Sequence, residues 1–165
     1  MGCGGGGGFA GSGYKHYGSF SDTTTQTASL NTAAYPMIFN TTEIADGVSI
    51  ANNSRITVAN TGIYNVQFSA QFYKSSGNAT NVHIWLRYTG SNVPRTAGIV
   101  EINGSQAKNI AAWNYVLPIV ANDYVELMWR TEDAGASGAV LLYETSGSSP
   151  TRPETPSVIV TVQQV

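Results

Sequence analysis

One ten-residue segment, from Ile63 to Phe72, constrains the fold of this chain more than any other feature. Its residues alternate between two classes without a slip. The apolar class occupies one parity: Tyr64, Val66, Phe68, Ala70 and Phe72. The polar class occupies the other: Asn65, Gln67, Ser69 and Gln71. Because successive side chains of a strand point to opposite faces, this pattern predicts a strand with one buried and one exposed face.

Shorter segments of the same kind predict further strands. They lie at 14–20, 31–39, 54–58, 82–87, 98–102, 110–120, 124–130, 139–144 and 157–165. Turn signals separate them at 40–43, 46–47, 60–62 and 89–92, and Asn103-Gly104 predicts a hairpin. Residues 146–156 form a polar, Pro-rich connection. Strands at intervals of roughly ten residues, with β-branched residues enriched and no amphipathic helix, predict an all-β sandwich or jelly-roll.

The N-terminal segment differs from the rest of the chain. Its first 13 residues hold eight glycines, which gives high backbone entropy and little side-chain surface to bury. Such a segment is either a passive linker or an arm that becomes ordered when a neighbouring protein holds it. We therefore expect an arm at 1–16 and one domain at 17–165.

Composition and charge exclude several classes of protein. Eight basic and ten acidic side chains give a net charge of −2 without a basic cluster, so we expect no nucleic-acid binding. The apolar runs are much shorter than a membrane span, and no apolar region follows Met1. We expect neither membrane insertion nor a secretion signal. The single cysteine, Cys3, forms no internal disulfide.

Catalytic and metal-binding patterns are weak. The two histidines, His16 and His83, lie far from each other and from Cys3, and no ligand pair occurs at metal-site spacing. A carboxylate pair that joins Glu126 to Glu132 or Asp133 stays open, since two acids of a glycosidase need only meet in space. Turn and strand-edge roles explain these acids more simply. We expect no enzyme, no cofactor and no metal.

Several segments resemble the globular head domains of complement-type proteins. Residues 56–69 resemble a strand followed by the Gly-x-Tyr-x-hydrophobic segment of those domains, and Val82–Arg87 resembles the next strand. Residues 121–127 are similar to their loop and following apolar strand, with Asn122 where Gly is usual, and 157–162 resembles the closing strand. The resemblance covers about 39–165.

A second resemblance is to small virion structural proteins of tailed phages, in particular phages of marine bacteria. It rests on residues 17–26, 112–114, 150–153 and 156–159. It implies a jelly-roll of about ten antiparallel strands that trimerises, as complement-type and tumour-necrosis-factor-like relatives do. In that fold the first and last strands pair on the sheet nearest the three-fold axis, so the arm would leave the head beside the axis.

The resemblance implies a homotrimeric virion protein, assembled in the host cytoplasm and attached to capsid or tail proteins. Its role would be decoration, cementing or a head fibre. The expected virion-anchoring residues are Gly2, Cys3, Gly4, Gly5, Gly6, Gly7, Gly8 and Phe9. The expected trimer-interface residues are Asn65, Gln67, Gln71, Trp113, Met128, Trp129, Ile159 and Thr161.

Two alternatives remain at this point. One is a receptor- or glycan-binding head of a fibre that contacts a glycan of the host surface, although the loops 89–96 and 132–138 hold few aromatic residues. The other is a complement-like surface or matrix protein, although the chain has no collagen-like stalk.

Overall fold

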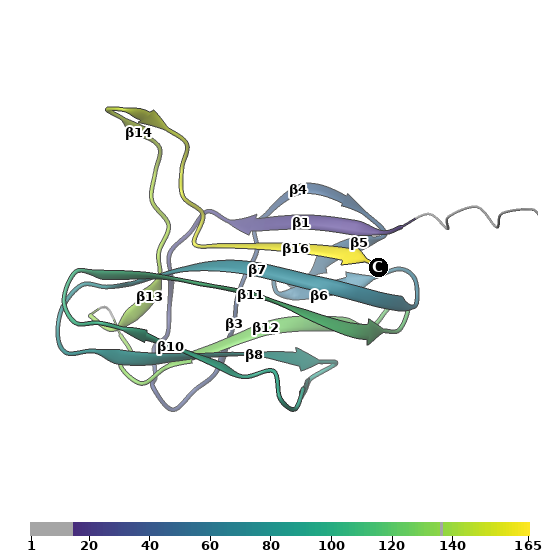
Figure 1. The fold of residues 1–165 in the computed structure, drawn as a ribbon, viewed down its shortest axis with the longest axis horizontal. Helices are drawn as coiled ribbons and strands as arrows, with labels where there is room; N and C mark the ends of the chain where they lie inside the picture. Colours follow the sequence, from purple (N-terminus) through teal and green to yellow (C-terminus); the bar gives the residue numbers. More distant parts are fainter. Residues whose placement is uncertain (1–14, 136) are drawn as a thin grey trace, which may run out of the picture.

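The computed structural model describes residues 15–135 and 137–165. Two sheets of seven strands each pack face to face, and a separate two-stranded hairpin projects from them (Figure 1). Neighbouring strands pair antiparallel in both sheets. The all-β sandwich that the sequence predicts is therefore confirmed.

The first sheet, called the β7 sheet, is built around the 13-residue strand β7. In pairing order it contains β2 (Gln26–Thr27), β13 (Ala139–Leu141), β7 (Gly62–Lys74), β16 (Val158–Gln164), β1 (Tyr17–Asp22) and β4 (Thr41–Asp46). β13 and β16 pair with successive parts of one edge of β7. The opposite edge of β7 pairs along its whole length with β11 (Ala107–Ile119).

The second sheet, called the β8 sheet, covers the inner face of the first. In pairing order it contains β10 (Gly98–Ile102), β8 (Thr80–Tyr88), β12 (Tyr124–Thr131), β6 (Arg55–Val58) and β5 (Val48–Ala51). The short strands β3 (Tyr35–Pro36) and β9 (Ser91–Asn92) pair with β12 and β8.

The core lies between the two sheets, and the parity of β7 places it there. All five apolar residues of the alternating segment are at most 2 % exposed. The Phe68 ring lies edge-on to Trp113, with 4.8 Å between the ring centroids, and Phe72 packs 5.9 Å from Trp129 of the opposite sheet. Burial of each large apolar side chain stabilises the fold by roughly 1.5–3 kcal/mol.

The turn predicted at 40–43 is wrong, whereas at 46–47 the chain does leave the β7 sheet for the β8 sheet, with a φ of 68° at Gly47. Residues 41–46 form β4, which pairs with β1 at the edge of the β7 sheet. Most of its side chains are exposed, so its sequence lacks an alternating apolar parity. Paired β-branched residues such as Thr41 and Thr42 favour the extended backbone nonetheless.

The hairpin predicted at Asn103-Gly104 is also wrong. The chain does reverse there, and Gly104 has a φ of 67°. However, β10 belongs to the β8 sheet and β11 to the β7 sheet, so the turn carries the chain from one sheet to the other. Turn chemistry thus identified the reversal and not the strand partner.

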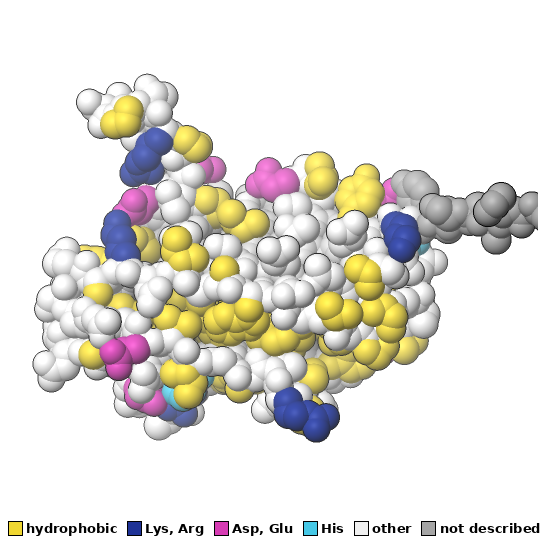
Figure 2. Space-filling view, in the orientation of Figure 1, with side chains coloured by type: hydrophobic (Ala, Val, Ile, Leu, Met, Phe, Trp, Pro, Cys, Tyr) yellow, Lys and Arg dark blue, Asp and Glu magenta, His cyan; other side chains and the backbone are white. Residues whose placement is uncertain are grey.

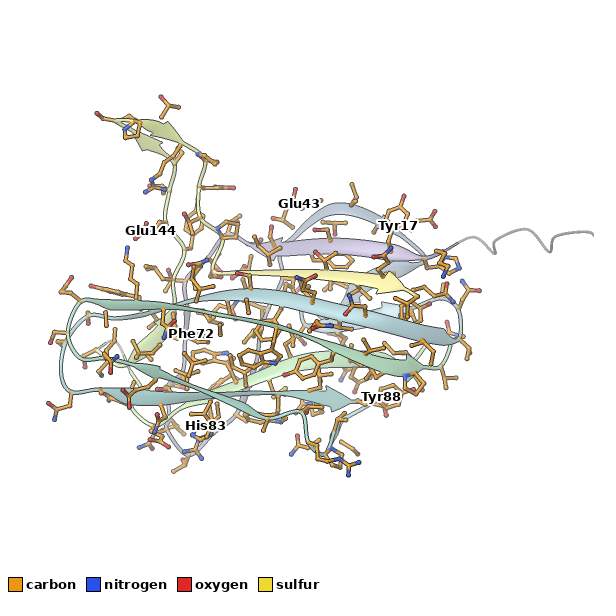
Figure 3. All side chains as sticks on the ribbon, viewed as in Figure 1. Tyr17, Glu43, Phe72, His83, Tyr88 and Glu144 are labelled. Atoms are coloured by element: carbon orange, nitrogen blue, oxygen red, sulfur yellow. The ribbon has the colours of Figure 1, made fainter. Side chains whose placement is uncertain are left out.

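The segment at 146–156, predicted as a connection, contains a projecting hairpin. Its strands are β14 (Gly147–Ser148) and β15 (Thr151–Arg152). Figure 3 shows Glu144 where the hairpin leaves the sandwich. At that point Glu144 forms ion pairs with Lys108 of β11 and with Arg152, whose Nη2 lies 3.5 Å from Glu144 Oε2.

The first and last long strands lie side by side, as the resemblance implies. β1 pairs with β16 from Tyr17 opposite Gln163 onward, and the carbonyl of His16 accepts a hydrogen bond from the Gln164 amide at 2.8 Å. The start of β1 and the end of β16 therefore occupy one end of the molecule, and the projecting hairpin lies toward the other (Figure 1).

Candidate assembly interface

The outer side of the β7 sheet carries a continuous surface without a charged side chain. Strand register places these residues together: Asn65 lies opposite Gln163 and Val116, and Gln67 lies opposite Thr161 and Asn114. We call this surface the uncharged face. It consists of Ile63, Asn65, Gln67, Ser69 and Gln71 of β7, Ile110, Ala112, Asn114, Val116 and Pro118 of β11, and Ile159, Thr161 and Gln163 of β16.

Large apolar side chains on this face are open to solvent. Ile110 and Val116 are 57 % and 60 % exposed, and Ile63 and Ile159 are 44 % and 39 % exposed. The polar residues between them are amides and hydroxyls, and Asn114 donates a hydrogen bond to Asn65 at 3.0 Å. In the view of Figure 2, the Lys, Arg, Asp and Glu side chains lie around the periphery and hydrophobic side chains gather near the middle.

The predicted interface residues of β7 and β16 all lie on this one face. Asn65, Gln67 and Gln71 project outward from β7, and Ile159 and Thr161 project outward from β16. The structure thus brings these five together. Their contact with another subunit remains a prediction.

Met128 and Trp129 are corrections to the predicted interface, because both are only 1 % exposed. Trp129 faces the core beside Phe72. Met128 pairs with Trp85 of β8 and Pro36 of β3, and it is buried although it has the outward parity. Neither side chain is available to a second subunit.

Trp113 is a third correction. It is half-buried and packs against the core residue Phe68, and a Cβ on Gly98 would lie only 2.8 Å from its ring. Its indole nitrogen donates to the Tyr115 hydroxyl at 2.6 Å. The residues of β11 that do face outward have the opposite parity: Lys108 at the start of the strand, then Ile110, Ala112, Asn114, Val116 and Pro118 of the uncharged face. Sequence reasoning missed them because β11 carries large apolar residues at both parities.

The outer side of the β8 sheet has a different character, and we call it the ionic face. Glu126 is 3 % exposed, and its carboxylate accepts hydrogen bonds from Ser54 at 2.8 Å and from Arg87 Nε at 2.9 Å. The guanidinium of Arg55 lies 3.9 Å from Glu126 as well and stacks over the Tyr124 ring.

A second ionic pair on this face joins His83 to Glu132. Their side chains meet at 3.0 Å, and Asn81 donates to the other Glu132 oxygen at 3.1 Å. These hydrogen bonds, that of His83 first, lower the pKa of Glu132 below its ordinary value. The third acid of the sequence hypothesis, Asp133, pairs with the buried Lys74. Each acid of the candidate carboxylate pair therefore has a basic side chain as a partner within the chain.

The predicted anchoring residues Gly2 to Phe9 lie outside the described residues. Within residues 15–135 and 137–165, no cluster of three or more His, Cys, Asp or Glu side chains is arranged to hold a metal ion. In the same residues no helix has the length and apolar character needed to cross a membrane.

No protein-family model matches the sequence, and no curated protein matches it. Solved structures with a similar fold include three crystal structures of murine APRIL, at pH 8.5, pH 5.0 and pH 8.0. Their sequence identities to this chain are 10 %, 11 % and 10 %, with TM-scores of 0.57, 0.58 and 0.59. Each alignment covers 92 % of this chain and 100 % of the APRIL chain. The protein therefore has the tumour-necrosis-factor-like jelly-roll fold, and the expected jelly-roll is confirmed.

Proposed function

We propose that this protein is a homotrimeric structural component of a phage virion, which assembles through the uncharged face and joins the particle by its N-terminal arm. The observation that carries the assembly is the absence of charge at the outward positions of three neighbouring strands, from 63 to 71 in β7, 110 to 118 in β11 and 159 to 163 in β16. Protein interfaces are depleted of charged residues at their centre, whereas ordinary surfaces are rich in them. A surface of exposed isoleucine, valine and amide groups suits contact with another protein.

A closed ring of three copies needs two different surfaces that fit each other, because each copy meets its neighbours head to tail. The uncharged face is one of these surfaces. A mainly apolar pocket of about 480 Å³ at the end of β11 is suited to be the other, with Tyr88, Val93, Leu117, Pro118 and Val120 in its lining. It adjoins the uncharged face through Pro118. Packing of this edge against the face of the next copy would close the ring.

The position of β1 supports the role of the arm. β1 lies beside β16, so in the proposed trimer the three chains would start close together at one end of the assembly. Three arms leaving that end together would form one attachment point. The assignment to a virion rests on the sequence resemblance.

The first test is the solution mass of the full chain by light scattering over a range of concentrations. We expect three times the 17.4 kDa of one chain, unchanged on dilution. A monomer at all concentrations would overturn the assembly.

The second test separates the arm from the head. A variant that lacks residues 2–13 should remain a trimer but no longer join virions assembled in its presence, while the full chain does. Normal incorporation of the shortened protein would overturn the anchoring role and leave the trimer intact.

A receptor- or glycan-binding head is the alternative function. The observation in its favour is a pocket on the opposite sheet, where Trp85 lies beside two arginines.

A further inference from the structure

A second pocket, of about 370 Å³, lies on the ionic face. Its floor is formed by His83 and Trp85 of β8 and by Arg130 of β12, and its wall is formed by residues of the segment 92–97. Figure 3 shows His83 on the outer side of β8. The volume is at the small end of the range for ligand sites, roughly 300–1,000 Å³.

The two arginines of this pocket differ from the other three in the chain. Arg55, Arg87 and Arg152 each lie within 4.0 Å of a carboxylate. Among the described residues, Arg95 and Arg130 have no such ion pair, and no acidic residue lines the pocket. Two guanidinium groups with no described carboxylate within 4.0 Å therefore border one small cavity.

The side chain of Arg130 has a nitrogen that lacks a hydrogen-bond acceptor. Its Nε is buried, and no described group forms a hydrogen bond with it. After the hydrogen bond from His83, the charge of Arg130 also contributes to the lowered pKa of Glu132, but Glu132 does not form a hydrogen bond with this Nε. A buried guanidinium nitrogen without a partner is costly. Because this Nε is closed to solvent, a ligand carboxylate would meet the half-buried guanidinium at its other nitrogens, through charge-assisted hydrogen bonds.

The wall of the pocket is held in a fixed shape. Thr96 Oγ1 donates to the Val93 carbonyl at 2.8 Å and accepts from the Leu86 amide at 3.1 Å. The Tyr115 hydroxyl also donates to the Thr96 carbonyl, at 2.9 Å. Next to this anchor, Arg95 adopts a φ of 64°, which residues with a side chain rarely occupy. Strained residues of this kind concentrate at ligand sites, where the surrounding structure fixes them in place.

An aromatic surface completes the pocket. The indole nitrogen of Trp85 donates to Asn92 Oδ1 at 2.9 Å, which sets the orientation of the ring. The geometry points to a binding site for an acidic sugar, a uronic acid unit whose carboxylate pairs with Arg95 and Arg130 while its ring packs against Trp85. Guanidinium groups match the planar geometry of a carboxylate, and the C–H face of a pyranose ring is apolar enough to cover an indole.

This site goes beyond the proposed virion role. Its floor lies on the β8 sheet, away from the uncharged face of the β7 sheet, but Asn92, Val93 and Pro94 of its wall also line the apolar pocket that is proposed to meet the next copy. It would give the head a means of contacting an acidic polysaccharide.

The test is a titration of the full chain with sodium D-glucuronate, followed by the indole NMR signal of Trp85, which a Trp85→Phe variant identifies. D-glucose is the neutral match. We expect the signal to move with glucuronate and glucose to bind at least about ten-fold more weakly, because it lacks the carboxylate. Added salt should weaken glucuronate binding, since the pocket is open to solvent.

The diagnostic variant is Arg95→Ala, whose side chain is exposed and whose removal spares the core. It should weaken glucuronate binding about ten-fold. The charge-matched control Arg152→Ala, in the projecting hairpin, should bind like the parent chain. Equal binding of glucose, or unchanged binding in Arg95→Ala, would overturn the site. Tighter binding of a tetraglutamate peptide than of glucuronate would overturn the sugar assignment.

Discussion

The two outer faces of the sandwich are built on the same alternation of residues, yet they expose opposite chemistry. On the β8 sheet the outward positions include Arg55, Arg87 and Glu126, and these charges pair with one another. On the β7 sheet the outward positions of the uncharged face carry isoleucine, valine, amides and hydroxyls. Around Glu126 the ionic face forms its own ion pairs, whereas the uncharged face leaves apolar side chains exposed.

The difference shows that the alternation of residues along a strand identifies the buried face but does not determine the chemistry of the exposed face. The central inward positions of both sheets are apolar because they line the same interior, and polar residues of inward parity, such as Lys74 and Thr80, lie at strand ends. Outward positions are free to differ, so their chemistry reports what each face meets. Paired charges are stable in contact with water, whereas covering exposed aliphatic side chains with another surface lowers the free energy of the system.

A charged residue introduced on the uncharged face gives the strongest test of the difference between the two faces. Under the proposed assembly, Gln67→Lys buries an unpaired ammonium in every interface, which costs several kcal/mol per contact and should dissociate the trimer completely. Sedimentation velocity measures the mass. The matched control is Thr57→Lys, an outward position of β6 on the ionic face, which should leave the mass unchanged. A Gln67→Lys protein that stays trimeric would place the interface elsewhere.

The next prediction contrasts neighbouring residues on opposite sides of β7. Phe68 faces the core and Gln67 faces outward. Phe68→Ala leaves a cavity beneath Trp113 and should lower the free energy of unfolding by about 3–5 kcal/mol. Gln67→Ala should change it by less than about 0.5 kcal/mol in the dissociated chain. Denaturant unfolding compares the two, and similar losses would mean that the parity of β7 is misassigned.

On the ionic face, Arg87→Leu removes the closest cation from the buried Glu126 carboxylate. Arg55 and Ser54 still contact that carboxylate, so we expect a loss of about 2–3 kcal/mol, less than for a pair without other contacts. The solution mass should stay the same. A change in oligomeric state without a loss of stability would show that this face, too, takes part in assembly.

The smallest effect concerns the exposed pair of His83 and Glu132. Because hydrogen bonds from His83 and Asn81 lower the pKa of Glu132, its ionised form stabilises the folded chain above pH 4.5, and that contribution is lost as the pH falls through the lowered value. NMR titration should give a Glu132 midpoint below 4.5, and His83→Ala should raise it. The carboxyl of Glu144, whose pKa is lowered first by Lys108, serves as the control and should not respond. An unchanged Glu132 midpoint would contradict the role of His83.

The sequence predicted the core well because, in a strand whose alternate residues are polar, the other residues are the buried ones. β7 and β16 satisfy that condition, so their outward residues Gln67 and Thr161 were placed correctly on one face. β12 does not satisfy it, because both Met128 and Trp129 are buried although they have opposite parity. The alternation of β12 separates Val125, Leu127 and Trp129 as one face, and these three are buried, but it does not predict the burial of Met128 at the other parity.

The pocket beside Trp85 depends on contacts that no local pattern encodes. The segment 92–97 reaches it only through the hydrogen bonds of Thr96 with Leu86 and Tyr115. The pairing of Arg87 with Glu126 is likewise set by cross-strand register. Register depends on the whole sheet, and for this reason these neighbours remained unknown until the fold was determined.

The place of β16 between β7 and β1 has a consequence for biosynthesis. Until residues 158–164 have been made, β1 has no partner on that side and the β7 sheet remains divided into two pieces. In the proposed assembly the uncharged face would be incomplete before that moment, so shortened chains should be unable to compete with finished ones. Under that proposal, only a chain completed through β16 would join the assembly.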